Sequence, residues 1–132
     1  MPMFFGYTRS HMAKKILLVD DDPGVHLIVT PLLAKEGYAV VSAKTGEQGL
    51  QLALSERPDL IILDVIMPGI KGRELCAKIK AYQVLKNIPV VFLTAKDSAD
   101  DLKAELEVGG LTHLTKPINP EHFITVIKEV IE

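Results

Sequence analysis

The chain has 132 residues, which is the usual size of one domain. Hydrophobic residues make up 48% and charged residues 24%, which excludes a disordered chain. The formal net charge is −2, so the basic field of a nucleic-acid-binding protein is missing. A single cysteine, Cys76, excludes an internal disulfide and a multi-cysteine zinc site. Because no apolar run approaches the length of a membrane span, we expect one cytoplasmic domain that contacts neither membrane nor nucleic acid.

The first eleven residues, MPMFFGYTRSH, show no periodicity, and the Ser10-His11-Met12 sequence resembles a junction left by cloning. The apolar residues at positions 3–5 are too few for the core of a signal peptide. We therefore expect residues 1–11 to be a disordered leader left by expression and residues 12–132 to form the domain. A native disordered arm is the alternative.

From Lys15 onward, short apolar runs alternate with stretches in which apolar residues recur at helical spacing. The runs predict strands buried on both faces, at positions 16–19, 38–42, 60–63, 89–93 and 111–114. The stripes predict helices that include Val25 to Leu33, Leu50 to Leu54, Leu75 to Tyr82, Leu102 to Val108 and Phe123 to Val130. Five strands alternating with five helices predict an α/β fold, in which right-handed crossovers cover both faces of a parallel sheet.

Polar side chains follow four of the five predicted strands, at the edge where such sheets bind ligands. They are Asp20, Asp21 and Asp22 after the first strand, Asp64 after the third, Thr94 after the fourth and Lys116 after the fifth. A single aspartate at a strand end is commonly a turn or helix-capping residue, and Asp22 before Pro23 is expected to be one. Complementary groups at four strand ends at once favour a functional site.

The clustered carboxylates indicate a metal-assisted reaction. Each close pair costs several kcal/mol at an effective dielectric constant near ~20, so the cluster needs a divalent cation, and oxygen ligands favour Mg²⁺ or Mn²⁺. A magnesium ion, an ammonium and a hydroxyl are groups that stabilise a phosphoryl group during transfer. Because neither GxxxxGK[ST] nor GxGxxG is present, a nucleotide is not the expected donor. Aspartate itself is a known phosphoryl nucleophile.

Four segments carry a family resemblance, and they are LLVDDDP at 17–23, LDVIMPG at 63–69, LTA at 93–95 and LTKP at 114–117. Together they resemble the signature segments of the response-regulator receiver domain of two-component signalling, as in chemotaxis regulators. The resemblance covers Lys14–Glu132. It implies a flavodoxin-like (βα)5 sandwich of three layers with strand order 2-1-3-4-5.

The resemblance also implies roles for the residues at the strand ends. Asp64 would be the phosphorylated carboxylate. Asp20, Asp21, Asp64 and the backbone carbonyl of Ile66 would hold Mg²⁺.

Three further residues receive implied roles. Thr94 would bond the phosphoryl group as the switch hydroxyl, and Lys116 would pair with it as a cation before a cis peptide to Pro117. His113 stands where the family most often has an aromatic switch residue. A lone histidine there is more often at the surface, but His113 could still serve as the moving ring.

The implied function is that of a phospho-acceptor in bacterial-type signalling. A sensor histidine kinase or a histidine phosphotransfer protein would donate the phosphoryl group, and a change of conformation would signal to an effector protein or effector domain. The phosphodonor is expected to dock on the exposed candidates His26, Thr30, Ile118 and Pro120. Ile66 and Lys96 flank the approach of water to Asp64, which predicts slow self-dephosphorylation.

Other functions are weighed against this one. A haloacid-dehalogenase-like phosphatase needs a second aspartate two residues after the first, where this chain has Ile66, so turnover of an external substrate is not expected. An EF-hand loop fails at Gly24 and Pro31. A flavodoxin would share the fold but would have no use for the acidic pair. A binding domain without phosphorylation stays open, as does the choice between a stand-alone domain and a part of a longer regulator.

Overall fold

The computed structural model describes residues 13–95 and 99–132, apart from the side chains of residues 99 and 100. Strands and helices alternate along the chain as β1 (Lys15–Val19), α2 (Pro23–Lys35), β2 (Ala39–Ala43), α3 (Gly46–Glu56), β3 (Leu60–Asp64), α4 (Gly72–Ala81), β4 (Val90–Thr94), α5 (Ala99–Glu107), β5 (Thr112–Thr115) and α6 (Pro120–Ile131). Every predicted strand and helix is present, and each strand from β2 onward ends one residue later than predicted. The expected leader at 1–11 lies outside the described residues.

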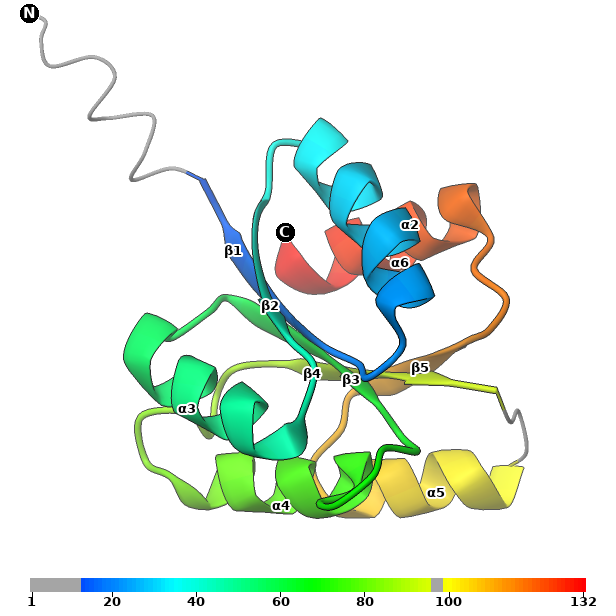
Figure 1. Cartoon of the computed structure of the whole chain (residues 1–132). Coiled ribbons are helices and arrows are strands. Elements are labelled where there is room, and N and C mark those ends of the chain that lie inside the picture. The colour runs from blue at the N-terminus through cyan, green and yellow to red at the C-terminus, as the bar shows by residue number, and fades with distance from the viewer. Residues whose placement is uncertain (1–12, 96–98) are drawn as a thin grey trace, which may run out of the picture.

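The five strands form one sheet in the order β2-β1-β3-β4-β5, and every neighbouring pair is parallel. Helices α2 and α6 cover one face, while α3, α4 and α5 cover the other (Figure 1). The predicted three-layer flavodoxin-like sandwich is therefore confirmed.

Two apolar cores lie on the two faces of the sheet. Successive residues of a strand alternate between them, so Ile16 and Leu18 join the core under α2 and α6, and Leu17 and Val19 join the other. All residues of β3 and β4 are buried, whereas β2 and β5 are only partly buried. The prediction of burial on both faces is wrong for β2 and β5, because these edge strands have a neighbour on one side only.

Helix α2 begins with Asp22 as its N-cap, as expected, and the Asp22 side chain accepts from the N–H of Gly24 at 2.8 Å.

The buried apolar faces of the helices contain fewer residues than predicted. Ile28 is 54% exposed, Leu106 is 47% exposed and Tyr82, which follows the end of α4, is 43% exposed. These three residues are therefore not core residues. Within the described residues, no helix is long and apolar enough to cross a membrane.

A close approach of two backbones places α4 against the end of β3. The N–H of Gly72, the first residue of α4, donates to the carbonyl of Val65 at 3.0 Å. A β-carbon added at Gly72 would lie 2.0 Å from the carbonyl oxygen of Asp64. Only glycine permits this contact.

We predict that Gly72→Ala lowers the free energy of unfolding by about 3 kcal/mol, because a backbone oxygen cannot yield as a flexible side chain does. Urea denaturation measures the loss. Gly24→Ala is the matched control, since its added β-carbon would first meet the Asp22 side chain, at 3.2 Å. The control should stay within about 1 kcal/mol of wild type, and equal losses in the two variants would contradict the role of Gly72.

Candidate functional site

The acidic pair lies immediately after β1. Asp20 is fully buried, whereas Asp21 is exposed. The N–H of Asp20 donates to the carbonyl of Ala43 at 3.1 Å, which extends the pairing of β1 with β2. Asp20 Oδ1 accepts from the N–H of Asp22 at 2.9 Å. These two bonds fix the turn and leave Oδ2 of Asp20 for the site.

His26 supports this turn from α2. Its Nε2 donates to the backbone carbonyl of Asp20 at 2.7 Å, and its Nδ1 is buried without a hydrogen-bond partner among the described residues. The ring is only partly exposed. The expectation that His26 is exposed is therefore wrong, and its bond to the Asp20 carbonyl makes it a positioning residue for the turn.

Asp64 is the last residue of β3 and is 5% exposed. Its Oδ1 accepts from the N–H of Ile66 and from Nζ of Lys116, each at 3.4 Å. Burial, and then the charge of Asp20, raise the pKa of Asp64 from 3.8 to about 6, although Lys116 opposes the shift. The site thus holds a carboxylate whose ionised form is destabilised by burial and by the neighbouring carboxylate.

Lys116 brings a cation to both carboxylates from the end of β5. Its N–H donates to the carbonyl of Thr94 at 2.7 Å, and its peptide bond to Pro117 is cis, as expected. Its Nζ lies 3.2 Å from Oδ2 of Asp20 and 3.4 Å from Oδ1 of Asp64. Burial disfavours the ammonium, but the two carboxylates outweigh burial and raise the pKa of Lys116.

Thr94 ends β4 at the same edge of the sheet and is 2% exposed. In the register of β3 with β4, Asp64 lies opposite Leu93, so Thr94 follows one position further along. Thr94 lines a hollow of about 260 Å³, together with Val65, Ile66, Lys71, Arg73 and Asp101. The predicted hydroxyl therefore lies at the edge of the sheet that carries the acidic cluster.

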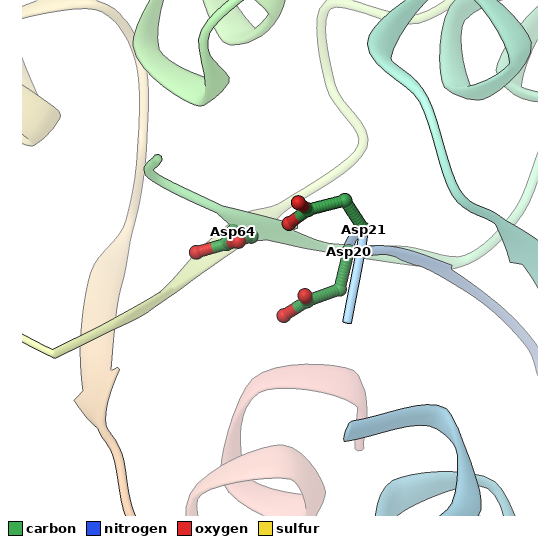
Figure 2. Close-up of side chains that lie close together, drawn as sticks. All are labelled: Asp20, Asp21 and Asp64. Carbon is green, nitrogen blue, oxygen red and sulfur yellow. The ribbon is translucent and has the colours of Figure 1, made fainter. Parts of the chain in front are cut away.

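The three carboxylates fit a divalent cation. One oxygen from each of Asp20, Asp21 and Asp64 lies within 4.8 Å of the others, and Figure 2 shows the three side chains gathered at the ends of β1 and β3. Oδ2 of Asp20 is buried and accepts no hydrogen bond from the described residues, because its contact with Lys116 is an ion pair without hydrogen-bond geometry. An all-oxygen donor set with one such acceptor suits Mg²⁺.

His113 lies in β5 and is not one of the three clustered carboxylate residues. It is more buried than the expected surface histidine. Its side chain is 9% exposed, and Nδ1 lies 2.8 Å from Oε1 of Glu105 in α5. The expectation of a surface histidine is therefore wrong. Glu105 is also bonded by Arg73 of α4, and sequence reasoning missed both residues. For Glu105, the only hint in the sequence was its place next to Leu106 in the predicted helix.

Comparisons with known proteins decide the family. The model of the response regulator receiver domain matches residues 16–128. The chain belongs to this family. Among curated relatives of this receiver domain, the alkaline phosphatase synthesis transcriptional regulatory protein PhoP of Bacillus subtilis is 37% identical over 120 residues, which are 91% of this chain and 49% of PhoP. Sporulation initiation phosphotransferase F of the same organism is 35% identical over 91% of this chain and 95% of its own length.

A similar solved structure is also a receiver domain, and it contains a magnesium ion. The receiver domain of the sensor histidine kinase PA1611 from Pseudomonas aeruginosa, solved with a magnesium ion in its active-site cleft, has a TM-score of 0.83. It is 27% identical, and the match covers 90% of this chain and 98% of that one. Receiver domains are phospho-acceptors of two-component signalling, so the predicted function is confirmed. The present chain spans about half the length of PhoP.

We predict that Asp64 makes stability depend on pH. Its pKa is about 6 when folded, against the ordinary 3.8, so between these values the folded state binds more protons than the unfolded chain. The free energy of unfolding contributed by Asp64 therefore falls as pH rises from about 4 to about 6. In EDTA at pH 7.5, Asp64→Asn should be more stable than wild type by about 1–3 kcal/mol.

Urea denaturation across this pH range provides the measurement. At pH 4, the gain from Asp64→Asn should disappear, because the wild-type carboxyl is then protonated in the folded protein. Glu129→Gln, which removes an exposed acid of α6, is the control and should show no such pH dependence. A gain for Asp64→Asn that stays constant from pH 4 to pH 7.5 would contradict the shifted pKa.

Proposed function

We propose that Asp64 is the phosphoryl acceptor of this receiver domain. The observation that carries this proposal is the buried position of Asp64 at the end of β3, with an ammonium 3.4 Å from its Oδ1 and two further carboxylates beside it. A carboxylate oxygen of Asp64 attacks phosphorus, the bond from phosphorus to the donor breaks, and the donor keeps the electron pair. A phosphohistidine of a sensor kinase or of a phosphotransfer protein is the donor.

Each neighbour of Asp64 has a role in this step. Asp20, Asp21 and Asp64 would hold Mg²⁺ with the backbone carbonyl of Ile66, and the cation supplies charge neutralisation on the phosphoryl oxygens. Lys116 supplies a second positive charge, and it is already held at Asp64 before transfer. The hydroxyl of Thr94 donates a hydrogen bond to the phosphoryl group and signals its presence.

We further propose that the chain acts on no external substrate. A phosphatase of the aspartate-nucleophile type needs an acid two residues after the nucleophile, and Ile66 cannot donate a proton. The domain thus catalyses only its own phosphorylation and dephosphorylation, and it works in the cytoplasm.

The docking surface for the phosphodonor follows from α2. Leu27 is 76% exposed and Ile28 is 54% exposed, and an apolar hollow beside them is lined by Pro23, His26, Leu27, Thr30, Pro31 and Lys44. This hollow begins two residues after Asp21. Because His26 is engaged with Asp20, the exposed aliphatic residues replace it as the docking contacts.

The decisive experiment is phosphorylation by acetyl phosphate in Mg²⁺, followed by intact-mass measurement. Wild type should gain one phosphoryl group, whereas Asp64→Asn and Asp21→Ala should gain none in the same time. Asp21→Ala should keep its fold, because removing a clustered carboxylate relieves repulsion.

Asp22→Ser is the matched control for Asp21→Ala. It removes the neighbouring acid but keeps an oxygen that caps α2, so it should be phosphorylated like wild type. Phosphorylation of Asp21→Ala at the wild-type rate would overturn the acidic-pair assignment. Retention of phosphate by Asp64→Asn would overturn the assignment of the acceptor.

We predict that the phosphorylated state lasts minutes or longer. Ile66, which is 60% exposed and lines the hollow beside Thr94, offers no hydrogen bond to orient an attacking water. Lys96, the second residue in this expectation, lies outside the described residues. Ile66→Asn should shorten the lifetime about tenfold, which corresponds to ~1.4 kcal/mol of transition-state stabilisation.

Loss of the phosphoryl group from purified phosphoprotein, followed over time by intact mass, measures this lifetime. Ile66→Val keeps the apolar character and is the control, which should decay like wild type. Wild-type decay within a few seconds, or slower decay in Ile66→Asn, would contradict the argument.

A further inference from the structure

Helix α5 is attached to the domain differently from the other helices. None of its residues belongs to either apolar core formed by the described residues. Among its described side chains, at 101–107, only Glu105 is buried, and the neighbouring Leu106 is 47% exposed. The one buried side chain among residues 101–107 is thus a carboxylate, while Leu102 and Ala104 are half-buried.

Two partners from other elements compensate this buried carboxylate. Oε1 of Glu105 lies 2.8 Å from Nδ1 of His113 in β5, and Oε2 accepts from Nη2 of Arg73 in α4 at 3.4 Å. The same Nη2 donates to Oδ1 of Asp101, one turn earlier in α5, at 3.0 Å. A buried carboxylate is tolerated only while such partners remain. Arg73 therefore links α4 to two carboxylates of α5, while His113 links Glu105 to β5.

Arg73 also faces the site. Arg73 and Asp101 line the hollow that contains Thr94 and Ile66, next to Asp64. Nε of Arg73 is buried and has no hydrogen-bond partner among the described residues. The guanidinium thus has an unused donor. It contacts two acids of α5 and lines the same hollow as Thr94, which ends β4.

We propose that Arg73 couples the phosphorylation of Asp64 to the docking of α5. This inference rests on the proposed role of Asp64. Phosphorylation adds negative charge beside the hollow, and that charge competes with Asp101 and Glu105 for the guanidinium, since a bidentate contact with phosphate suits arginine. As Arg73 turns toward the phosphoryl group, Glu105 loses a counter-ion and α5 loosens from α4. Arg73 acts as a positioning residue and takes no part in bond making.

Hydrogen exchange of α5, with and without beryllofluoride and Mg²⁺, tests the coupling. Beryllofluoride serves as a stable phosphoryl mimic, and fluorine NMR verifies that it has loaded. In wild type, loading should make amide exchange in residues 101–107 severalfold faster and leave exchange in α3 unchanged. In Arg73→Gln, exchange in α5 should already be fast before loading, and loading should not increase it further.

Matched variants separate coupling from a loss of folding. Lys78→Gln removes an exposed cation from the same helix and should respond like wild type. Arg73→Lys keeps the charge without the planar fork, and it should retain part of the response. Glu105→Gln removes a negative charge that competes with the phosphoryl group for Arg73, so its α5 should respond less than that of wild type.

Three outcomes would overturn the coupling. Unchanged α5 exchange in loaded wild type would overturn it alone, while the assignment of Asp64 would stand. A response in loaded Arg73→Gln that equals the wild-type response would also overturn it. Failure of wild type to load beryllofluoride would overturn the coupling together with the proposed role of Asp64.

Discussion

The repulsion between two buried carboxylates is the constraint on which the site depends. Asp20 and Asp64 present oxygens within 4.8 Å of each other at adjacent strand ends. At an effective dielectric constant of ~20, two such charges repel by about 3–4 kcal/mol. The register of Val19 with Leu63 holds the two aspartates side by side, and the apolar residues of β1 and β3 keep those strands buried. The apolar cores thus hold the charges together, and Lys116 offsets part of the repulsion.

The repulsion between Asp20 and Asp64 also bears on the proposed transfer of a phosphoryl group. The ammonium of Lys116 is already paired with both carboxylates, so the proposed phosphoryl transfer to Asp64 would need little reorganisation of charge. Burial, and then the charge of Asp20, raise the pKa of Asp64 even with Lys116 beside it, so Lys116 offsets only part of these effects. A divalent cation held by Asp20, Asp21 and Asp64 would complete the neutralisation, and this would link metal binding to the proposed acceptor.

The sheet and the cluster at its edge could be predicted from the sequence because both follow from short-range rules. Parallel strands end at one edge, so Asp64, Thr94 and Lys116 were expected to lie together as soon as the strands were located. The departures occurred where burial depends on neighbours. The number of neighbouring strands is a property of the whole sheet, and the runs in β2 and β5 look no different locally from those in β3.

The contacts of Glu105 and His26 could not be predicted in this way. Glu105 and Leu106 are neighbours in a helix, so their side chains point in directions about 100° apart, and only one of them can face the sheet. Composition favours Leu106 as the inward residue, whereas Arg73, 32 positions earlier, and His113 hold Glu105 inward. His26 bonds a backbone carbonyl. Every residue has such a carbonyl, so this contact leaves no sequence signal.

The two faces of the sheet therefore differ in how they respond to charge. Helix α2 is held by Val25, Val29 and Leu33 in an apolar core, and apolar contacts are nearly indifferent to a charge added elsewhere. Helix α5 is held in part through Glu105 and its partners Arg73 and His113, and the energies of these ionic contacts change with nearby charges. A phosphoryl group at the proposed acceptor would lie between the apolar core that holds α2 and the ionic contacts of α5. If Asp64 is phosphorylated as proposed, this asymmetry would direct the response toward α5. It would leave the α2 side unchanged as the proposed surface for the phosphodonor.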